Sequence, residues 1–128
     1  MLDRETVLNV IKIYKESWEN QDSVKILSIF TNDARYHERV LKKPYNGHAE
    51  IKKYWETKVV EEQSNIKFEL LNLYIDGSTV IAEWDAKFNN LKKGTRVHMI
   101  EVAILEFAGD KIQSLREYWV SESVDILE

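Results

Sequence analysis

The fold of this chain is decided by the stretch RVHMIEVAILEFAGDKIQSLREYWV, residues 96–120. Apolar residues alternate along both halves of the stretch, and Ala108-Gly109-Asp110 separates the halves. Because strand side chains point alternately to opposite faces, this pattern predicts two antiparallel strands joined by a hairpin. Glu101 and Glu117 each share a face with apolar neighbours. A carboxylate on such a face is costly to bury unless it is paired, solvated or protonated, so we predict a cavity with a polar role there.

The length of the hairpin loop determines how close these two acids lie. A three-residue loop would place Glu101 directly opposite Glu117, with their Cβ atoms about 4.5–5.5 Å apart. Carboxyl groups that close would share a proton, and the pKa of one of them would rise. A two-residue Gly109-Asp110 loop would shift the register by one residue and separate the acids. The sequence leaves both registers open.

The rest of the chain supplies two more strands and a helical first half. Residues 66–75 and 80–88 alternate as strands, and Asp76-Gly77 between them is a strong hairpin signal. In the first half, the spacing predicts one helix with Asp3 as its N-cap, a second that starts at Asp22-Ser23, and a third after residue 47. Their predicted buried residues are, in order, Val7, Ile11, Tyr14 and Trp18; Ile26, Leu27 and Phe30; and Ile51, Tyr54, Trp55 and Val59.

Between the second and third helices, Thr31-Asn32-Asp33 is expected to end the helix, and residues 34–40 to form a short strand. Helices that are segregated from a run of antiparallel strands indicate an α+β fold. We therefore expect residues 1–128 to form a single domain, in which a curved antiparallel sheet wraps around three N-terminal helices. This cone-shaped roll would leave a pocket at its wide end.

Composition narrows the classes of function. The 128 residues carry a formal net charge of −4 and no cysteine, which excludes disulfides and thiolate metal sites and argues against nucleic acid as a partner. No apolar run reaches membrane-spanning length and the N-terminus has no signal-peptide pattern, so we expect a cytoplasmic protein. The three histidines are scattered over different predicted elements, and we expect no metal and no other cofactor.

The strand over residues 96–107 is apolar on both sides, because Ile100, Val102 and Ile104 alternate with the inward set. One side can face the helices, and a large exposed apolar patch on the other side would mark an interface. We therefore predict a homodimer through the outer face of the sheet. The alternative is that the C-terminal residues Val124, Ile126 and Leu127 cover this face.

Several segments, taken in their order and spacing, resemble a known superfamily over nearly the whole chain. They are Trp18-Glu19-Asn20-Gln21-Asp22, Phe30-Thr31-Asn32-Asp33-Ala34, Gly47-His48-Ala49-Glu50-Ile51-Lys52-Lys53-Tyr54-Trp55, Gly109-Asp110-Lys111-Ile112 and Arg116-Glu117-Tyr118-Trp119. The chain thereby resembles the NTF2-like superfamily, in its SnoaL-like and ketosteroid-isomerase-like branch. This resemblance implies the cone fold, whereas activity has to be argued from the site, because one fold hosts many activities.

The resemblance also implies roles for three residues. Tyr14 lies where ketosteroid isomerases place a tyrosine, and Glu38 lies where they place an aspartate base. Their third position, a neutral acid, falls at Ala103, which argues against steroid isomerisation. The Asp-Arg-Asp set of epoxide hydrolases is also incomplete, since only Glu117 matches an acid. Glu117 is in addition the closest counterpart of the single late-strand acid of polyketide cyclases.

These residues predict a pocket for a small hydrophobic organic ligand. Tyr14, Glu38 and Glu117 are the candidate catalytic residues, by proton abstraction beside a carbonyl with Tyr14 stabilising the oxyanion. The candidate ligand-binding residues are Trp18, Tyr36, Tyr54, Trp55, Trp84, Phe88, Met99, Glu101 and Trp119. Two other interpretations stay open: the aromatic residues are plain core, and Glu38 pairs with a nearby basic side chain at a solvated strand end. The functional hypothesis is a cofactor-free isomerase, cyclase or lyase, with a non-catalytic ligand-binding or dimeric interaction domain as the alternative.

Overall fold

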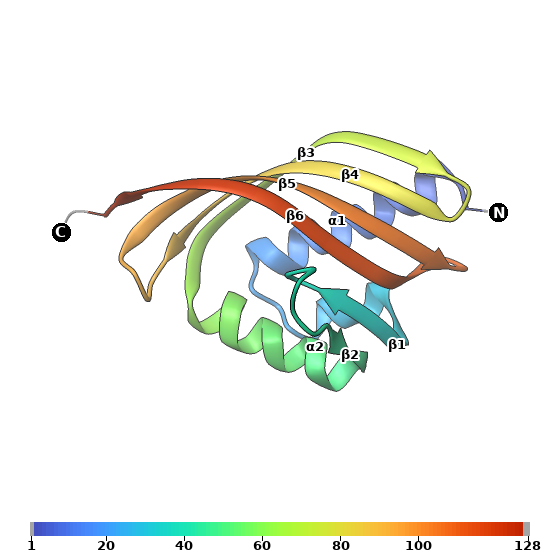
Figure 1. Ribbon diagram of the computed structural model, residues 1–128, viewed down its shortest axis with the longest axis horizontal. Coiled ribbons are helices and arrows are strands. Elements are labelled where there is room, and N and C mark those ends of the chain that lie inside the picture. Colours follow the sequence, from blue (N-terminus) through green and yellow to red (C-terminus); the bar gives the residue numbers. More distant parts are fainter. Residues whose placement is uncertain (1, 127–128) are drawn as a thin grey trace.

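The computed structural model describes residues 2–126, in which one six-stranded sheet curves over two α-helices (Figure 1). The helices are α1 (Arg4–Glu19) and α2 (Gly47–Trp55), with a 3-10 turn η1 (Lys25–Ile29) after α1 and a π-helical turn η2 (Glu56–Glu61) after α2. The strands are β1 (Phe30–His37), β2 (Tyr45–Asn46), β3 (Gln63–Asp76), β4 (Thr79–Asn90), β5 (Thr95–Ala108) and β6 (Lys111–Asp125). They lie side by side in the order β2-β1-β6-β5-β4-β3.

Helix α1 begins and packs as its sequence predicts. The side chain of Asp3 caps the helix by accepting a hydrogen bond from the Thr6 backbone N–H at 2.8 Å. The buried stripe includes Tyr14 and Trp18, which face the sheet together with the aliphatic residues of the same stripe. No helix between residues 2 and 126 has the length and apolar character needed to cross a membrane.

The prediction of three N-terminal helices was wrong, because the second is only the 3-10 turn η1. The Asp22 side chain accepts hydrogen bonds from the backbone N–H groups of Val24 and Lys25, where this turn begins. Phe30, predicted to lie in a helix, instead starts β1 and pairs with Ile112 of β6. Thr31-Asn32-Asp33 therefore continues a strand instead of preceding one, and the strand covers residues 30–37 and not 34–40.

The sheet is mixed, whereas an all-antiparallel sheet was predicted. β1 runs parallel to β6, with Tyr36 opposite Leu115, and the other strand pairs are antiparallel. A parallel pair needs a long connection between its strands, and here the whole chain from β2 to β5 provides it. The consequence for the site is that Tyr36 is brought next to the residues of β6.

The hairpin between β5 and β6 has the shorter loop, Gly109-Asp110, since Ala108 pairs with Lys111. A register shift follows between Glu106 and Phe107, which pair with Ser114 and Ile112. This irregularity adds one residue to β6 and returns the two acids to the same face. Glu101 is then opposite Trp119 and Glu117 is opposite Ala103, so the acids are diagonal neighbours on adjacent strands. Of the two registers that the sequence left open, the structure has the two-residue loop, but the irregularity keeps the acids close instead of separating them.

The outer face of the sheet carries apolar side chains without cover from the C-terminal segment. Ile81, Tyr118 and Val120 are 40%, 44% and 70% exposed. The C-terminal residues extend β6 alongside β5, where Ile126 N–H donates to the Gly94 carbonyl at 2.9 Å, so the alternative of a C-terminal cover over this face is wrong for residues up to 126. Leu127 lies outside the described residues. The homodimer stays a prediction, which this exposed face supports.

Candidate active site

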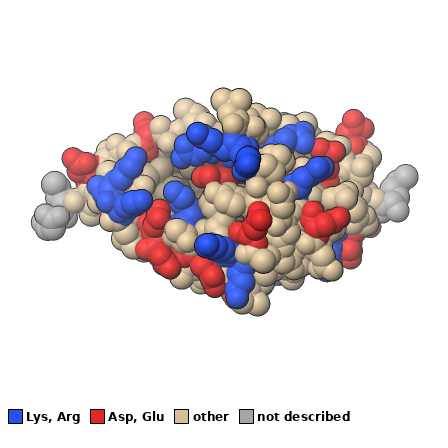
Figure 2. Space-filling model, turned by 60° about the horizontal axis from the view of Figure 1, so that its bottom comes forward, with Lys and Arg blue, Asp and Glu red and all other residues tan. Residues whose placement is uncertain are grey.

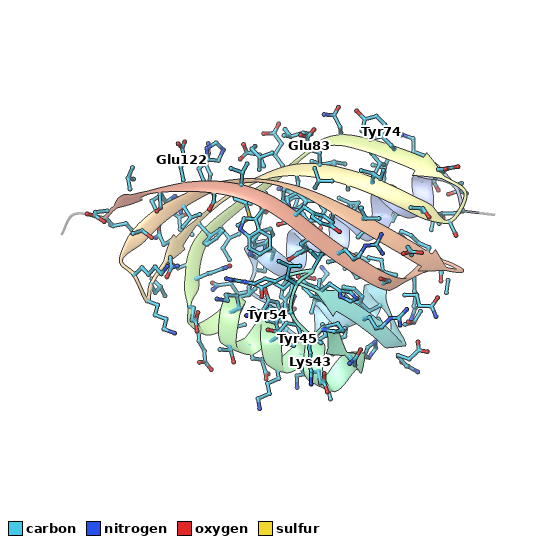
Figure 3. The ribbon with its side chains drawn as sticks, viewed as in Figure 1. Lys43, Tyr45, Tyr54, Tyr74, Glu83 and Glu122 are labelled. Atoms are coloured by element: carbon cyan, nitrogen blue, oxygen red, sulfur yellow. The ribbon has the colours of Figure 1, made fainter. Side chains whose placement is uncertain are left out.

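A cavity of about 220 Å³ lies between the helices and the inner face of the sheet. The sheet curves away from α2 here, and Figure 3 shows Tyr54 of α2 directed into the space between them. The residues that line the cavity are Tyr14, Trp18, Tyr36, Glu38, Arg39, Tyr54, Trp55, Lys58, Val59, Glu62, Gln63, Phe88, Asn90, Lys93, Thr95, Val97, Met99, Glu101, Glu117, Trp119, Ser121 and Ser123. All three predicted catalytic residues are among them.

A cluster of three oxygen atoms occupies the inner part of the cavity wall. Glu117 Oε2 accepts hydrogen bonds from the hydroxyls of Tyr14 at 3.1 Å and Tyr36 at 3.0 Å. The two hydroxyl oxygens are themselves 3.2 Å apart. Each tyrosine has only one hydroxyl proton, so when both donate to Glu117 the contact between the tyrosines carries no hydrogen bond. One carboxylate oxygen from β6 is thus held by residues from α1 and β1.

Polar contacts at the end of α1 fix the position of Tyr14. The Glu19 carboxylate accepts a hydrogen bond from the Phe68 backbone N–H at 2.8 Å, and Lys15 Nζ donates to the Phe68 carbonyl at the same distance. Lys15 and Glu19 also form an ion pair at 2.8 Å. Because this pair holds α1 against β3, Tyr14, which directly precedes Lys15, faces the sheet, where its ring centroid lies 4.9 Å from that of Trp84.

Burial changes the acidity of Glu117. The residue is 7% exposed, and desolvation raises its pKa to about 7. Hydrogen bonds from Glu101, Tyr36 and Tyr14 oppose this rise, since they stabilise the ionised form. The negative charge of Glu38 adds to it. The result is a carboxyl group that is close to half-ionised at neutral pH, which is the property of a general base poised for proton transfer.

Glu101 is more strongly perturbed than its neighbour. It is 3% exposed, and desolvation, followed by the charge of Glu117 and a hydrogen bond shared with it, raises the pKa of Glu101 well above its ordinary value. The indole N–H of Trp84, directly across in β4, partly offsets the rise. That contact is too loose to satisfy either group, because Trp84 Nε1 and Glu101 Oε2 are both buried without a hydrogen-bond partner.

The tyrosines of the cavity stay protonated. Burial, together with the negative charge of Glu117, raises the pKa of Tyr14, Tyr36 and Tyr54 well above the ordinary value. A neutral phenol can donate a hydrogen bond, whereas a phenolate cannot. The site therefore holds hydroxyl donors beside a carboxyl group that ionises near neutral pH.

Glu38 lies immediately after β1, in the wall of the same cavity. Its side chain is 16% exposed and lies 3.8 Å from Arg39 Nε, one of the basic partners expected of a solvated glutamate. Arg39 in turn lies over the ring of Trp119, with its guanidinium carbon 5.8 Å from the ring centroid. Glu38 thus combines the two interpretations of its sequence position, because it lines the cavity and also contacts a cation.

Lys and Arg side chains gather around the hollowed region on the face shown in Figure 2, and Arg39, Lys58 and Lys93 are the basic residues of the cavity wall. Sequence reasoning missed the lysines, which looked like ordinary solvated surface. It also missed Ser121 and Ser123, although they continue the alternation of Glu117 and Trp119 beyond the predicted strand end at residue 120. Gln63 was missed as well, because β3 starts before the predicted residue 66.

Of the nine predicted ligand-binding residues, only Trp84 does not line the cavity. Trp84 is fully buried behind the wall, with its ring 4.9 Å from Tyr14 and 5.1 Å from Phe68. Trp18 does line it and is held by a hydrogen bond from Nε1 to Gln63 Oε1 at 2.8 Å. Residues 2–126 contain no group of three His, Asp or Glu side chains that could hold a metal ion.

Comparison with known proteins identifies the family of this fold. A model of the SnoaL-like domain matches residues 10–115. The chain belongs to the SnoaL-like family. Its arrangement is that of NTF2-like and ketosteroid-isomerase-like proteins, as the sequence resemblance predicted. A search of curated protein sequences finds no significant match.

Three solved structures illustrate how far this SnoaL-like chain resembles known proteins. SalBIII, an epoxide hydrolase/cyclase-like enzyme of pyran ring formation in salinomycin, has a TM-score of 0.79 at 24% identity, with 94% of this chain and 95% of that chain covered. An epoxide hydrolase from M. tuberculosis has a TM-score of 0.74 at 14% identity, with 91% of this chain and 84% of that chain covered. A protein from Catenulispora acidiphila, in complex with trimethylamine, has a TM-score of 0.76 at 16% identity, with 85% of this chain and 83% of that chain covered. At these identities the likeness shows the fold alone.

Proposed function

We propose that this SnoaL-like protein binds a small hydrophobic carbonyl compound in its cavity and acts on it by cofactor-free acid/base chemistry. Glu117 is the base, and Tyr14 and Tyr36 position its carboxylate. The observation that supports this most strongly is the buried carboxyl of Glu117, whose pKa is raised to about 7 while two phenol hydroxyls hold one of its oxygens. Perturbed acids in a cleft are typical of functional sites.

The proposed chemistry starts with removal of a proton from the carbon beside the carbonyl. Glu117 takes this proton, and the carbonyl oxygen gains negative charge as the enolate forms. Once Glu117 is neutral, it holds the two tyrosine hydroxyls less strongly. Tyr14, which is itself buried, can then donate its hydrogen bond to the enolate oxygen and stabilise it.

Glu38 is a second candidate for the base in this proposal. It lines the same cavity and matches the family position, but its carboxylate already has a cationic partner, since it lies 3.8 Å from Arg39 Nε. Glu117 is favoured because its carboxyl is the more deeply buried one. The exposed outer face of the sheet supports a homodimer whichever acid is the base.

A second candidate function is non-catalytic binding of a small amine. Rings from Trp18, Trp55, Tyr54 and Trp119 surround the cavity together with buried carboxyl groups. Aromatic faces and a carboxylate are the groups that recognise an alkylammonium ion. The trimethylamine complex of the Catenulispora acidiphila protein has this ligand chemistry in a related fold.

The experiment that tests the proposal uses 5-nitrobenzisoxazole, which loses a carbon-bound proton to a base and opens to a coloured phenolate. The wild-type protein should accelerate this opening, with a rate that increases as the pH rises through about 7. Glu117→Gln should reduce the acceleration by roughly 10²–10⁴-fold. Glu122→Gln, at a side chain that is 85% exposed on the outer face of β6, is the matched control and should keep the rate.

Binding separates loss of the base from loss of the pocket. The unreactive 5-nitroindazole, which has a similar shape, should bind Glu117→Gln and wild type alike, as measured by calorimetry. A wild-type rate equal to that of buffer, combined with tight binding of trimethylammonium, would replace the acid/base proposal by the amine-binding one. If the rate acceleration persists in Glu117→Gln and disappears in Glu38→Gln, the base is Glu38 and not Glu117.

A further inference from the structure

One carboxyl oxygen in the cavity wall is buried without a hydrogen-bond partner. It is Oε2 of Glu101, a residue that is 3% exposed and lines the cavity. Almost all buried polar atoms in native structures have a hydrogen-bond partner. A buried oxygen without one therefore needs an explanation, such as a role in catalysis or a contact with a bound ligand. A carboxyl group that keeps its proton would satisfy this oxygen by donating to a ligand.

The register of the last hairpin explains why Glu101 would keep a proton. Glu101 and Glu117 are diagonal neighbours on one face, close enough for the charge of Glu117 to act on Glu101. Two carboxyl groups in such a position hold one proton between them, because both cannot be ionised in a poorly solvated site. The two tyrosine hydroxyls donate to Glu117 and so stabilise its charge. The proton therefore belongs to Glu101, and the charge belongs to Glu117.

We propose that Glu101 is the general acid for an elimination in which Glu117 is the base, so that the natural substrate carries an oxygen leaving group next to an activated C–H bond. This inference rests on the proposed function and adds to it the second catalytic residue and the reaction type. The substrate class is a β-hydroxy or β-alkoxy carbonyl compound, and the reaction is of the lyase type.

The bonds and protons of this reaction balance within the pair. Glu117 takes the proton beside the carbonyl, and the electrons of that C–H bond form the new C=C bond. The C–O bond breaks with its electron pair on oxygen, and Glu101 gives this oxygen its proton, so the leaving group departs as water or an alcohol. Glu101 is then ionised and Glu117 is protonated.

Proton transfer between the two neighbouring carboxyl groups returns the pair to its starting state. The proton on Glu117 passes back to Glu101, and the next cycle can begin without exchange with solvent. An isomerase that only moves a proton along a substrate needs one group for this task. Two adjacent carboxyl groups with different protonation states suit a reaction that removes one proton and delivers another at the same time.

The test uses a series of benzisoxazoles with the full chain, because opening of this ring breaks a C–H bond and frees a phenolate oxygen. The 5-nitro compound has a good leaving group, whereas the unsubstituted ring has a poor one that gains more from a proton donor. Glu101→Gln keeps the shape of the side chain but has no proton to give. We expect Glu101→Gln to reduce the rate of ring opening roughly 10-fold with the 5-nitro compound and roughly 10²-fold or more with the unsubstituted ring.

Glu101→Leu gives a second variant of similar size without a polar group, and near-ultraviolet circular dichroism checks that both variants fold. Both should show the greater loss with the poorer leaving group, while Glu122→Gln should lose nothing with either compound. An equal loss across the series would show that Glu101 has only a structural role and would overturn this inference. In that case Glu117→Gln would still abolish the acceleration, so the proposed function would stand. If Glu117→Gln kept the full rate with every compound, both proposals would fail.

Discussion

Glu101 and Glu117, on the inner face of the sheet, are 3% and 7% exposed, and the pKa of each is raised by burial. Glu106 of β5, on the outer face, has a cationic partner and is exposed to solvent. There, Glu106 accepts a 2.6 Å hydrogen bond from Arg116, and its side chain is 48% exposed. Glutamates on the same two strands thus have different properties because they lie on different faces of the sheet. On the inner face they are suited to proton transfer, and on the outer face Glu106 forms a solvated ion pair.

Figure 3 makes the outer side of this comparison visible. Tyr74, Glu83 and Glu122 point away from the sheet, opposite to the side where Tyr54 lies. The alternation of strand side chains is the cause, because a shift of one residue moves a side chain from one face to the other. The irregularity between Glu106 and Phe107 therefore decides whether Glu117 belongs to the cavity.

The largest effect on stability is expected from an aromatic residue of the inner side. Trp84 is fully buried against Tyr14 and Phe68, so Trp84→Ala should lower the free energy of unfolding by about 3–5 kcal/mol. Tyr74→Ala, on the outer face at 60% exposure, should change it by only about 0.5 kcal/mol. Urea denaturation at a fixed pH measures both. Equal losses would contradict the assignment of the two faces.

The pH dependence of stability sharpens the comparison further. Below about pH 4.5, Glu117 is protonated in the folded and the unfolded state alike. Between about 4.5 and 7 the unfolded chain releases this proton while the folded protein keeps it, so stability decreases as the pH rises. The loss that Glu117 causes should be roughly 3 kcal/mol between pH 4 and 8. Urea denaturation should show a flatter profile for Glu117→Gln. A wild-type protein whose stability rises across this range would argue against buried acids.

Much of this comparison could be predicted from the sequence, because periodicity reports which face a residue occupies. The alternation over residues 96–120 placed Glu101 and Glu117 on an apolar face, and Asp76-Gly77 correctly marked a hairpin. The register of the last hairpin could not be predicted. Its two-residue loop alone would have put the acids on different faces, and nothing in the sequence signals the extra residue near Gln113 that restores them.

The beginning of the sheet was harder to predict, because its structure depends on distant residues. Thr31-Asn32-Asp33 looks like a local helix stop, and yet it lies in β1, which is held by pairing with β6 at a separation of about eighty residues. That pairing carries Tyr36 to Glu117. The sequence could therefore predict that Tyr36 lines the cavity, but it could not predict that the Tyr36 hydroxyl donates a hydrogen bond to the Glu117 carboxylate.

A moderate effect should follow when one tyrosine hydroxyl is removed from the inner cluster. Tyr36 donates to Glu117 and so lowers its pKa, and Tyr36→Phe should raise that pKa by about one unit. The pH profile of benzisoxazole opening measures the change as a shift toward higher pH. Tyr54→Phe is the control, since Tyr54 lines the cavity without a hydrogen bond to Glu117, and its profile should stay in place. Coincident profiles for all three proteins would contradict the role of Tyr36.

The smallest effect is expected on the outer face. Glu106→Gln removes the ion pair with Arg116, and it should change the free energy of unfolding by less than about 1 kcal/mol, because exposed ion pairs are screened by water and salt. Urea denaturation at low and high salt provides the measurement. A loss of several kcal/mol would show that this face is buried, as it would be at the interface of a tight homodimer.

The central claim is that the inner face holds a carboxyl group tuned to neutral pH, and NMR titration of the side-chain carboxyl carbons tests it most directly. The Glu117 signal is assigned by its absence from the spectrum of Glu117→Gln. It should titrate with a pKa of about 7, far from the 4.5 of an ordinary glutamate. A Glu117 signal that titrates near 4.5 would contradict the account.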